Sequence, residues 1–375
     1  YIDEDNPENN KSAVANVTVL GPADDYRTAP HMGSGDEFTV ALKADGTVWT
    51  WGKNTEGQLG QGGRTSDRNI IPTQVTFSGL ASNAYITKIA VGKAHVVALD
   101  SDGNIWTWGD NTYGQLGDGT YGTSNVDKFV PRQVRIGQNE SNTKLLTNIK
   151  YVAAGANSSA AIDQDGLLYV WGNNDNGQLG VDGKIVAYPT LVEALKDNPA
   201  TPNADETILV SAVELSESHT IIIDALTKRA YTWGKNDHNQ LGYQQSILNN
   251  GKPMTSPSTE NYAKEAHLVT RDKGDLNFLE VASGKNHSVG IVIPASEAET
   301  ATQGTVYAWG DNTHGQLGLG DETEVATPKK LAIANVRQIS VGGRSEEHTS
   351  ELQSLEDIVS PIQLEKKRGG GGGGG

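Results

Sequence analysis

The sequence predicts an all-β protein: a β-propeller of four-stranded blades whose ring is incomplete, with about five to six blades. The main observation is a ten-residue pattern, Trp-Gly-x-Asn-x-x-Gly-Gln-Leu-Gly, hereafter the Trp-Gly motif. It occurs five times, beginning at Trp51, Trp108, Trp171, Trp233 and Trp309. Successive copies are 57 to 76 residues apart, which is enough for four short strands and a variable loop. Alternating apolar and polar residues, typical of strands, precede the motif.

The strands are clearest in the unit that begins at Ile86. Alternation predicts a first strand that ends at Val91, a second over 95–99 and a third over 104–108. An Asp-Gly pair joins the second and third strands, and the same pair stands at this place in two other units. Because Asp-Gly favours the positive φ angles of tight turns, we expect hairpins at Asp45-Gly46, Asp102-Gly103 and Asp165-Gly166.

The motif itself is explained by backbone geometry and packing. Its seventh position is Gly57, Gly114, Gly177 and Gly315, but Asn239 in the fourth copy, which predicts a left-handed backbone there. The side chains of the motif leucines are predicted to be buried in the core: Leu59, Leu116, Leu179, Leu241 and Leu317. The motif tryptophans are expected to fill the same hole in each unit.

Both ends of the chain differ from the repeats. We expect three segments: an acidic segment over 1–31 that includes the end of a preceding blade, propeller repeats over 32–343, and a non-native tail over 344–375. The tail resembles the translation of a sequencing-library adapter, and the lack of an initial Met predicts a fragment of a longer protein. A further unit starts at Val336 and loses its likeness to the others after Gly342.

The five motif copies resemble the repeat of the regulator of chromosome condensation family. The resemblance covers roughly residues 32 to 343, with Phe38 and Ser158 where the family prefers His. It implies a propeller that has seven blades in complete members. It also implies two kinds of activity: nucleotide exchange on a Ran-like small GTPase, and inhibition of secreted enzymes such as β-lactamases.

The composition of the chain limits the classes of partner that we expect it to bind. The formal net charge is −16, so the chain repels phosphate backbones and we expect no nucleic-acid partner. The absence of cysteine excludes disulfides and thiolate chemistry. No membrane span is visible in the sequence. Abundant Gly, Asn, Thr and Asp with an acidic balance is typical of a bacterial secreted or surface protein, so we expect an extracellular or cell-surface location.

No residue grouping indicates catalysis. His95, His219 and His287 share one repeat position, but lie in different blades, so we expect ring nitrogens bonded to neighbouring backbone. We expect His31, His238, His267 and His314 to be exposed. Ser158-Ser159 lacks a nucleophile elbow, and the loops at Asp110 and Asp118 lack the ligand order of a calcium loop. We therefore predict no enzyme, no cofactor and no metal.

Variable residues within the invariant turns are the candidate binding positions. Repeat folds build binding faces from fixed turns that carry different side chains. The candidates in the motif turns are Glu56, Tyr113, Asn176, His238 and His314, and two more, Tyr243 and Tyr262, lie in a long insert over 243–276. A second insert spans 294–303.

The leading hypothesis is a non-catalytic binding module of a bacterial secreted or surface multidomain protein, whose blade-edge loops bind a protein or a cell-wall polymer. The alternatives are an exchange factor for a Ran-like GTPase and a secreted enzyme inhibitor. An incomplete propeller also leaves two blade faces without neighbours, which predicts self-association.

Overall fold

The computed structural model describes residues 27–122, 128–137, 144–195, 207–243, 262–271, 275–298 and 300–341. Within these ranges the chain forms twenty strands in five antiparallel sheets of four. The helices of the described part are two single 3-10 turns, Glu193–Leu195 and Ala295–Glu297. The all-β prediction is therefore confirmed.

Each sheet is built from four strands that follow one another in the chain. The first sheet has β1 (His31–Ser34), β2 (Phe38–Leu42), β3 (Val48–Asn54) and β4 (Thr65–Gln74). The second has β5 (Ile86–Val91), β6 (His95–Asp100), β7 (Ile105–Gly109) and β8 (Lys128–Gln133). The third has β9 (Ile149–Ala154), β10 (Ser158–Asp163), β11 (Leu168–Asn173) and β12 (Ile185–Leu191). The fourth has β13 (Val210–Leu215), β14 (His219–Asp224), β15 (Ala230–Lys235) and β16 (Tyr262–Leu268). The fifth has β17 (Asn277–Ser283), β18 (His287–Ile293), β19 (Thr305–Gly310) and β20 (Val325–Lys330).

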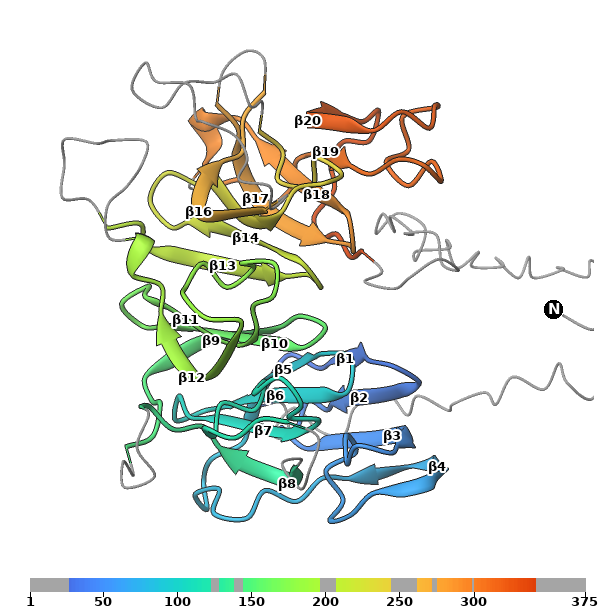
Figure 1. Cartoon of the computed structure of the whole chain (residues 1–375), viewed down its shortest axis with the longest axis vertical. Coiled ribbons are helices and arrows are strands. Elements are labelled where there is room, and N and C mark those ends of the chain that lie inside the picture. The colour runs from blue at the N-terminus through green and yellow to red at the C-terminus, as the bar shows by residue number, and fades with distance from the viewer. Residues whose placement is uncertain are drawn as a thin grey trace, which may run out of the picture.

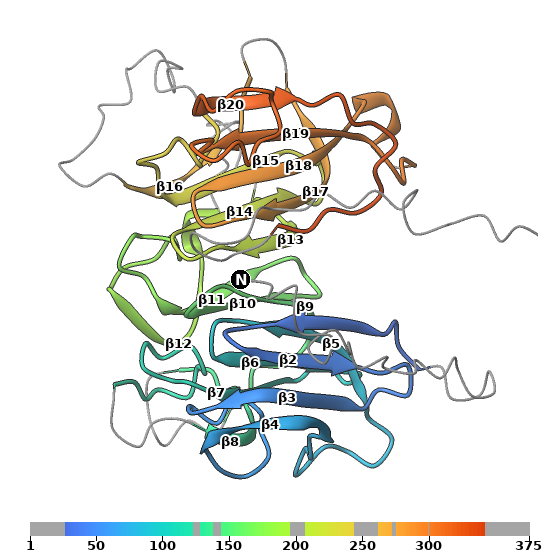
Figure 2. The same cartoon turned by 90° about the vertical axis from the view of Figure 1, so that its right-hand side faces the viewer.

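The five sheets are the blades of an open propeller. They follow one another in an arc, with the first sheet at one end and the last sheet at the other (Figures 1 and 2). The first strands of neighbouring blades contact one another, as β5 does with β9 and β9 with β13. The ring is not closed, which confirms the prediction of an incomplete propeller.

The chain beyond β20 begins another unit. Val336 and Gly304 form an isolated antiparallel bridge, and Val336 N donates to Gly304 O over 3.0 Å. Ile86 N makes the corresponding bond to Gly46 O, and Val210 N to Gly166 O. Val336 therefore occupies the place where the first strand of the next blade starts, as the sequence predicted.

The predicted strands and turns agree with the structure to within a residue. Gly46, Gly103 and Gly166 have φ of 81°, 79° and 86°, as the Asp-Gly hairpins require. In the motif turns, Asn239 has φ of 57°, beside 66° to 78° for the glycines at this position. This confirms that the position needs a left-handed backbone. The five motif leucines are buried, also as predicted.

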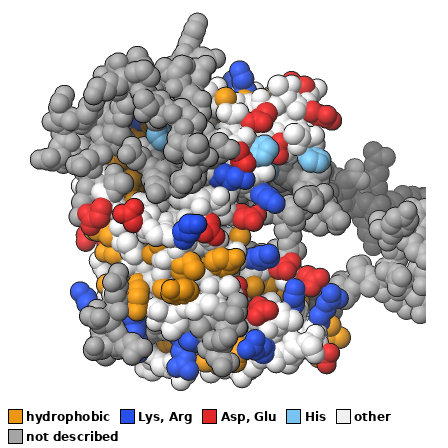
Figure 3. Space-filling model, in the orientation of Figure 1, with side chains coloured by type: hydrophobic (Ala, Val, Ile, Leu, Met, Phe, Trp, Pro, Cys, Tyr) orange, Lys and Arg blue, Asp and Glu red, His pale blue; other side chains and the backbone are white. Residues whose placement is uncertain are grey.

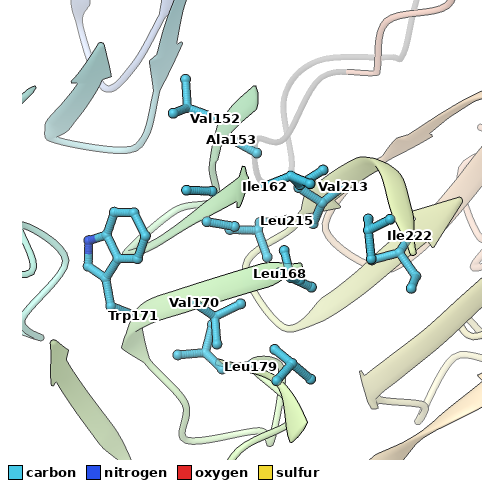
Figure 4. Packing of buried hydrophobic residues seen from close by; sticks show 14 of the residues in the cluster. Val152, Ala153, Ile162, Leu168, Val170, Trp171, Leu179, Val213, Leu215 and Ile222 are labelled. Atoms are coloured by element: carbon cyan, nitrogen blue, oxygen red, sulfur yellow. The ribbon is translucent and has the colours of Figure 1, made fainter. Parts of the chain in front are cut away.

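The core lies between blades. Figure 4 shows Ile162, Leu168 and Val170 of the third sheet beside Val213, Leu215 and Ile222 of the fourth. Because both faces of an inner blade are covered, every residue of β6, β10 and β14 is buried. In β2 burial alternates, since one face of the first blade has no neighbour.

Candidate interaction face

Three of the motif tryptophans are hydrogen-bonded to the preceding blade. Trp108 Nε1 donates to Gln58 O over 3.0 Å, and Trp171 Nε1 to Gln115 O over 2.8 Å. In both bonds the acceptor belongs to the motif turn of the preceding blade. The hole that each of these tryptophans fills therefore lies at the junction with the preceding unit. Trp309 repeats this bond with Gln240 O over 2.9 Å.

Histidines and hydroxyl groups form a second set of junction bonds. His95 Nε2 lies 3.0 Å from Ser159 Oγ of the next blade, and Ser159 Oγ donates to Gln115 O over 2.8 Å. His219 Nε2 lies 2.9 Å from Ser288 Oγ, which donates to the Gln240 carbonyl over 3.0 Å. We expected neighbouring backbone as the partner. The structure instead adds a side-chain hydroxyl of the next blade, because the ring points across the junction.

Burial keeps these imidazoles neutral. Desolvation lowers the pKa of His95 to about 4 and that of His219 to about 3. It also lowers the pKa of His287. In His95 and His219 a neutral ring with Nε2–H donating to a hydroxyl is a packing device, and the three histidines lie in separate blades. No metal or catalytic role follows from this arrangement.

The strand connections define two faces of the arc. In every blade the loop between the first and second strands and the motif turn between the third and fourth lie at the same strand ends. We call this side the turn face; it comprises residues 35–37, 92–94, 155–157, 216–218 and 284–286 together with the motif turns 54–60, 111–117, 174–180, 236–242 and 312–318. The opposite side, the hairpin face, carries the turns between second and third strands at 43–47, 101–104, 164–167, 225–229 and 294–304. The described residues of the second predicted insert, 294–303, therefore lie on the hairpin face, whereas the described part of the first, 243–276, includes the blade strand β16.

All five predicted motif-turn residues lie on the turn face in one backbone geometry. The amide of each donates to the side-chain oxygen of the motif glutamine, over 2.9 Å for Glu56, 2.8 Å for Tyr113 and 2.9 Å for Asn176, His238 and His314. His314 is exposed, and the other four are half-buried. His238 Nδ1 lies 3.7 Å from Glu324 Oε2 of the next blade. The structure thus brings the five onto one face, whereas their binding role stays a prediction.

The tyrosines of the long insert differ. The Tyr243 ring stacks on His267 with centroids 4.5 Å apart. His267 is half-buried and its pKa is lowered to about 4 by desolvation, so its predicted exposure is wrong. Tyr262 lies in β16, but its side chain is outside the described residues. The prediction that His31 and His238 are exposed is also wrong: both are half-buried, and the His31 ring accepts a bond from Ile89 N over 3.2 Å.

Sequence reasoning missed the loops between first and second strands. These loops lie side by side on the turn face: Asp36 N donates to Lys93 O over 2.7 Å, and Lys93 N to Ala156 O over 2.9 Å. They add charged side chains, for example Lys285, whose Nζ lies 3.9 Å from Glu217 Oε2. Their signal in the sequence is the variable pair that follows the glycine after each first strand, which is Ser216 in the fourth blade.

A charged cluster lines the inner strands. Lys88 Nζ lies 3.4 Å from the ring centroid of Tyr151, and Tyr151 is hydrogen-bonded to Glu214. Desolvation, with Glu280 nearby, raises the pKa of Glu214 to about 7 although Lys88 opposes the shift. The Glu280 pKa is also raised by desolvation, and its carboxylate accepts a bond from Ile339 N over 3.2 Å. The cluster connects four blades at the centre of the arc.

The acidic loops considered for calcium are bonded internally. Asp110 Oδ1 accepts from Thr112 N and Asp118 Oδ1 from Thr120 N, over 2.8 and 3.0 Å. Lys128 Nζ also lies 3.1 Å from Asp118 Oδ2. Among the described residues no group of three or more His, Asp or Glu side chains is arranged to hold a metal. A search of the same residues found no helix with the length and apolar character that crossing a membrane requires.

These features define a repeat propeller whose surface chemistry is concentrated in loops. The family model of the RCC1-like domain matches residues 4–346, and the chain belongs to this family. The chain is 26% identical over 315 residues to Protein pim1 of Schizosaccharomyces pombe, covering 82% of this chain and 51% of that protein. It is 27% identical to the Ultraviolet-B receptor UVR8 of Arabidopsis thaliana (84% and 59% covered) and 28% identical to the guanine nucleotide exchange factor SRM1 of Saccharomyces cerevisiae (82% and 59% covered). The chain thus spans between half and three-fifths of these relatives.

Solved structures agree on the fold. A structure of Prp20p from Saccharomyces cerevisiae, described with its binding properties to Gsp1p and histones, gives a TM-score of 0.63 at 24% identity, covering 84% of this chain and 66% of that one. Human WBSCR16 gives a TM-score of 0.55 at 18% identity, covering 84% and 85%. The similar proteins named above come from yeasts, a plant and human. These comparisons therefore do not support the prediction, made from composition, that the chain is bacterial.

Proposed function

We propose that the chain is a non-catalytic protein-binding module that contacts its partner through the turn face. The observation that carries the proposal is the set of five motif turns with one backbone geometry and different side chains. Because the motif glutamine fixes each turn, a partner meets a preorganised surface and little ordering entropy is lost on binding. The net charge of −16 favours a basic partner surface.

A protein partner is preferred to a cell-wall polymer because relatives of this fold are described with protein partners. Prp20p is described with Gsp1p and histones, and a second structure with TM-score 0.63 shows Kap60 bound to yeast RCC1. Location outside a bacterial cell rests on composition alone and stays a prediction. Inhibition of a secreted enzyme likewise stays a prediction.

Titration of the fluorescently labelled chain with purified Gsp1p and with core histones tests the proposal. A variant with Tyr113→Ala, His238→Ala and His314→Ala should bind at least about tenfold more weakly than the wild type. The matched control changes three exposed hairpin-face residues, Asp102→Ala, Asp165→Ala and Leu226→Ala, and should bind like the wild type. No saturable binding to either protein, or equal losses in the two variants, would contradict the proposal.

Guanine nucleotide exchange is a second candidate, favoured by the 28% identity to SRM1. The measurement is release of a fluorescent GDP analogue from Gsp1p. A rate that the chain does not raise, in a sample that binds Gsp1p, would leave the binding proposal standing and reject exchange.

A further inference from the structure

Three tyrosines gather on the turn face where the second and third blades meet. Tyr113 lies in the second motif turn, Tyr121 follows that turn, and Tyr188 lies in β12 of the third blade. Gly122 N donates to Thr112 O over 3.0 Å, so the loop that carries Tyr121 folds back on the turn that carries Tyr113. We call Tyr113, Tyr121 and Tyr188 the tyrosine cluster.

Tyr188 reaches this loop from the neighbouring blade. A Cβ placed on Gly119 would clash with Cε1, Cζ and the hydroxyl oxygen of Tyr188, so the ring lies directly against the Gly119 backbone. Gly119 N also donates to Ala187 O over 3.0 Å. On the side of Tyr113, a Cβ on Gly114 would lie 2.9 Å from Ala187 Cα. The chain next to Tyr113 therefore contacts the chain next to Tyr188, and the cluster spans one junction.

Side-chain bonds hold the loop of the cluster in place. Asn111 Nδ2 donates to Thr120 O over 2.9 Å and to Asp118 Oδ1 over 3.0 Å. Tyr121 nevertheless has 56% of its surface exposed, and the other two members of the cluster are half-buried. Aromatic side chains that are accessible on a fixed backbone are typical of binding hot spots, since little ordering entropy is lost when a partner binds.

The fold does not require tyrosine at these positions. The three equivalents at any junction are the residue before the turn glycine, the fourth residue after the motif, and the residue two beyond the strand partner of the first motif glycine. They are Glu56, Arg64 and Val130 at the first junction, Asn176, Lys184 and Glu265 at the third, and His238, Ser246 and Thr327 at the fourth. Blade packing therefore does not explain why all three are tyrosine at the second junction.

The first junction shows which group fits against an aromatic ring in this setting. There Arg64, the equivalent of Tyr121, places its guanidinium carbon 5.3 Å from the ring centroid of Phe129 on the next blade. At the second junction that arginine is replaced by a tyrosine. Among the described residues, the rings that have a Lys or Arg over them lie outside the cluster: Trp49, Tyr85, Phe129 and Tyr151. A partner can therefore supply the cation that the second junction lacks.

The charges around the cluster favour the same ligand. Residues 110–122 contain two aspartates and no Lys or Arg, and on the third blade Asp175 and Asp182 are exposed together with Lys184. In Figure 3 hydrophobic side chains, a class that includes tyrosine, gather over the second and third blades. A planar guanidinium stacks on aromatic rings and donates in a fixed fork to carboxylates, whereas an ammonium is a compact, strongly hydrated charge. The surroundings therefore suit arginine better than lysine.

We propose that the tyrosine cluster binds an arginine side chain of a basic segment on the partner protein. This inference rests on the proposed function, because it names the chemistry that one part of the turn face recognises. The guanidinium stacks on the exposed Tyr121 ring, and the acidic surroundings attract its charge.

Two synthetic peptides test the proposal on the wild-type chain. One is a labelled peptide of alternating glycine and arginine, and the other has lysine in place of every arginine and thus the same charge. Fluorescence anisotropy at about 150 mM salt screens the long-range attraction that both peptides share. The arginine peptide should bind at least about threefold more tightly. Equal affinities would overturn the proposal without the use of any variant.

Paired substitutions locate the site. Tyr121→Ala with Tyr188→Ala should weaken binding of the arginine peptide at least about tenfold and remove its advantage over the lysine peptide. Tyr121→Phe with Tyr188→Phe keeps both rings and should bind within about twofold of the wild type. The matched control is Tyr85→Ala, at a half-buried tyrosine beside the hairpin turn 43–47. Thermal melts check that each variant is folded; if the Ala pair unfolds, the Phe pair and the two peptides decide.

Core histones separate this inference from the proposed function. If the wild type binds them and the Ala pair binds both histones and the arginine peptide as tightly as the wild type, the cluster is not an arginine site, while the turn-face proposal stands. If the wild type binds neither core histones nor Gsp1p, the proposed function fails and this inference fails with it. A Phe pair that loses as much affinity as the Ala pair would also overturn the stacking of arginine on the rings.

Discussion

The tryptophan junction can be tested with a pair of glycines that differ only in their neighbours. Gly180 and Gly318 end the third and fifth motif copies and both have φ of 66°. A Cβ on Gly180 would lie 2.9 Å from Trp233 Nε1 and 3.2 Å from Cε2, whereas one on Gly318 meets no described atom within 4 Å. Both Ala variants should lower the free energy of unfolding by about 1 to 2 kcal/mol, because a residue with a Cβ is strained in the left-handed region. Gly180→Ala alone adds overpacking of about 1 to 3 kcal/mol.

We therefore expect Gly180→Ala to lower the free energy of unfolding by about 1 to 3 kcal/mol more than Gly318→Ala. The assay is urea unfolding followed by circular dichroism at low protein concentration, with the midpoints compared at equal slope. Gly183→Ala, at a positive φ where a Cβ would make only an ordinary van der Waals contact of 3.6 Å with Ile185 O, gives a second measure of the backbone cost. Equal losses at Gly180 and Gly318 would refute the packing of Trp233 on the preceding motif turn.

Three further predictions concern pH and burial. His95 and His219 have pKa values of about 4 and about 3 in the folded chain, so below pH 6.5 the unfolded state binds protons that the folded state does not. Stability should fall as pH drops from 6.5, by about 2 kcal/mol per histidine at pH 5, and His219→Gln should flatten the slope of urea midpoints. Glu214, with its pKa raised to about 7, has the opposite sign: its contribution is complete below about pH 4.5 and is lost as pH rises through 7. Glu214→Gln should therefore gain stability relative to the wild type at pH 8 but not at pH 5, and a thermal-melt difference independent of pH would contradict this. Trp171→Phe should cost about 2 to 4 kcal/mol and Trp51→Phe less than about 1, since only Trp171 is buried and bonded across a junction; equal shifts in the melts would contradict this reading.

The repeat register was readable from the sequence because its signals are local. The exchange of Gly for Asn239 at one motif position predicted a left-handed backbone, and φ at that position depends on a single turn. The hairpins at Gly46 and Gly103 follow from two adjacent residues. The start of a further unit at Val336 was visible for the same reason, since one register recurs along the chain.

The candidate site could be predicted only in part. Repetition placed Glu56, Tyr113 and the other motif-turn residues in equivalent positions, and the structure places them on one face. The loops between first and second strands were missed because neighbouring loops meet through backbone bonds such as Asp36 N to Lys93 O, which join residues far apart in the chain.

The sequence by itself determined that this protein is built from repeated four-stranded units with fixed turns, since strand alternation, turn glycines and motif spacing are local properties of the chain. The tertiary structure decided which contacts the repeated Trp and His side chains make. Trp108 reaches Gln58, and His95 reaches Ser159, only after blades stack. It also decided that Trp51 and Ile70 remain uncovered, because burial at either end of the arc depends on a neighbouring blade and not on the residue itself.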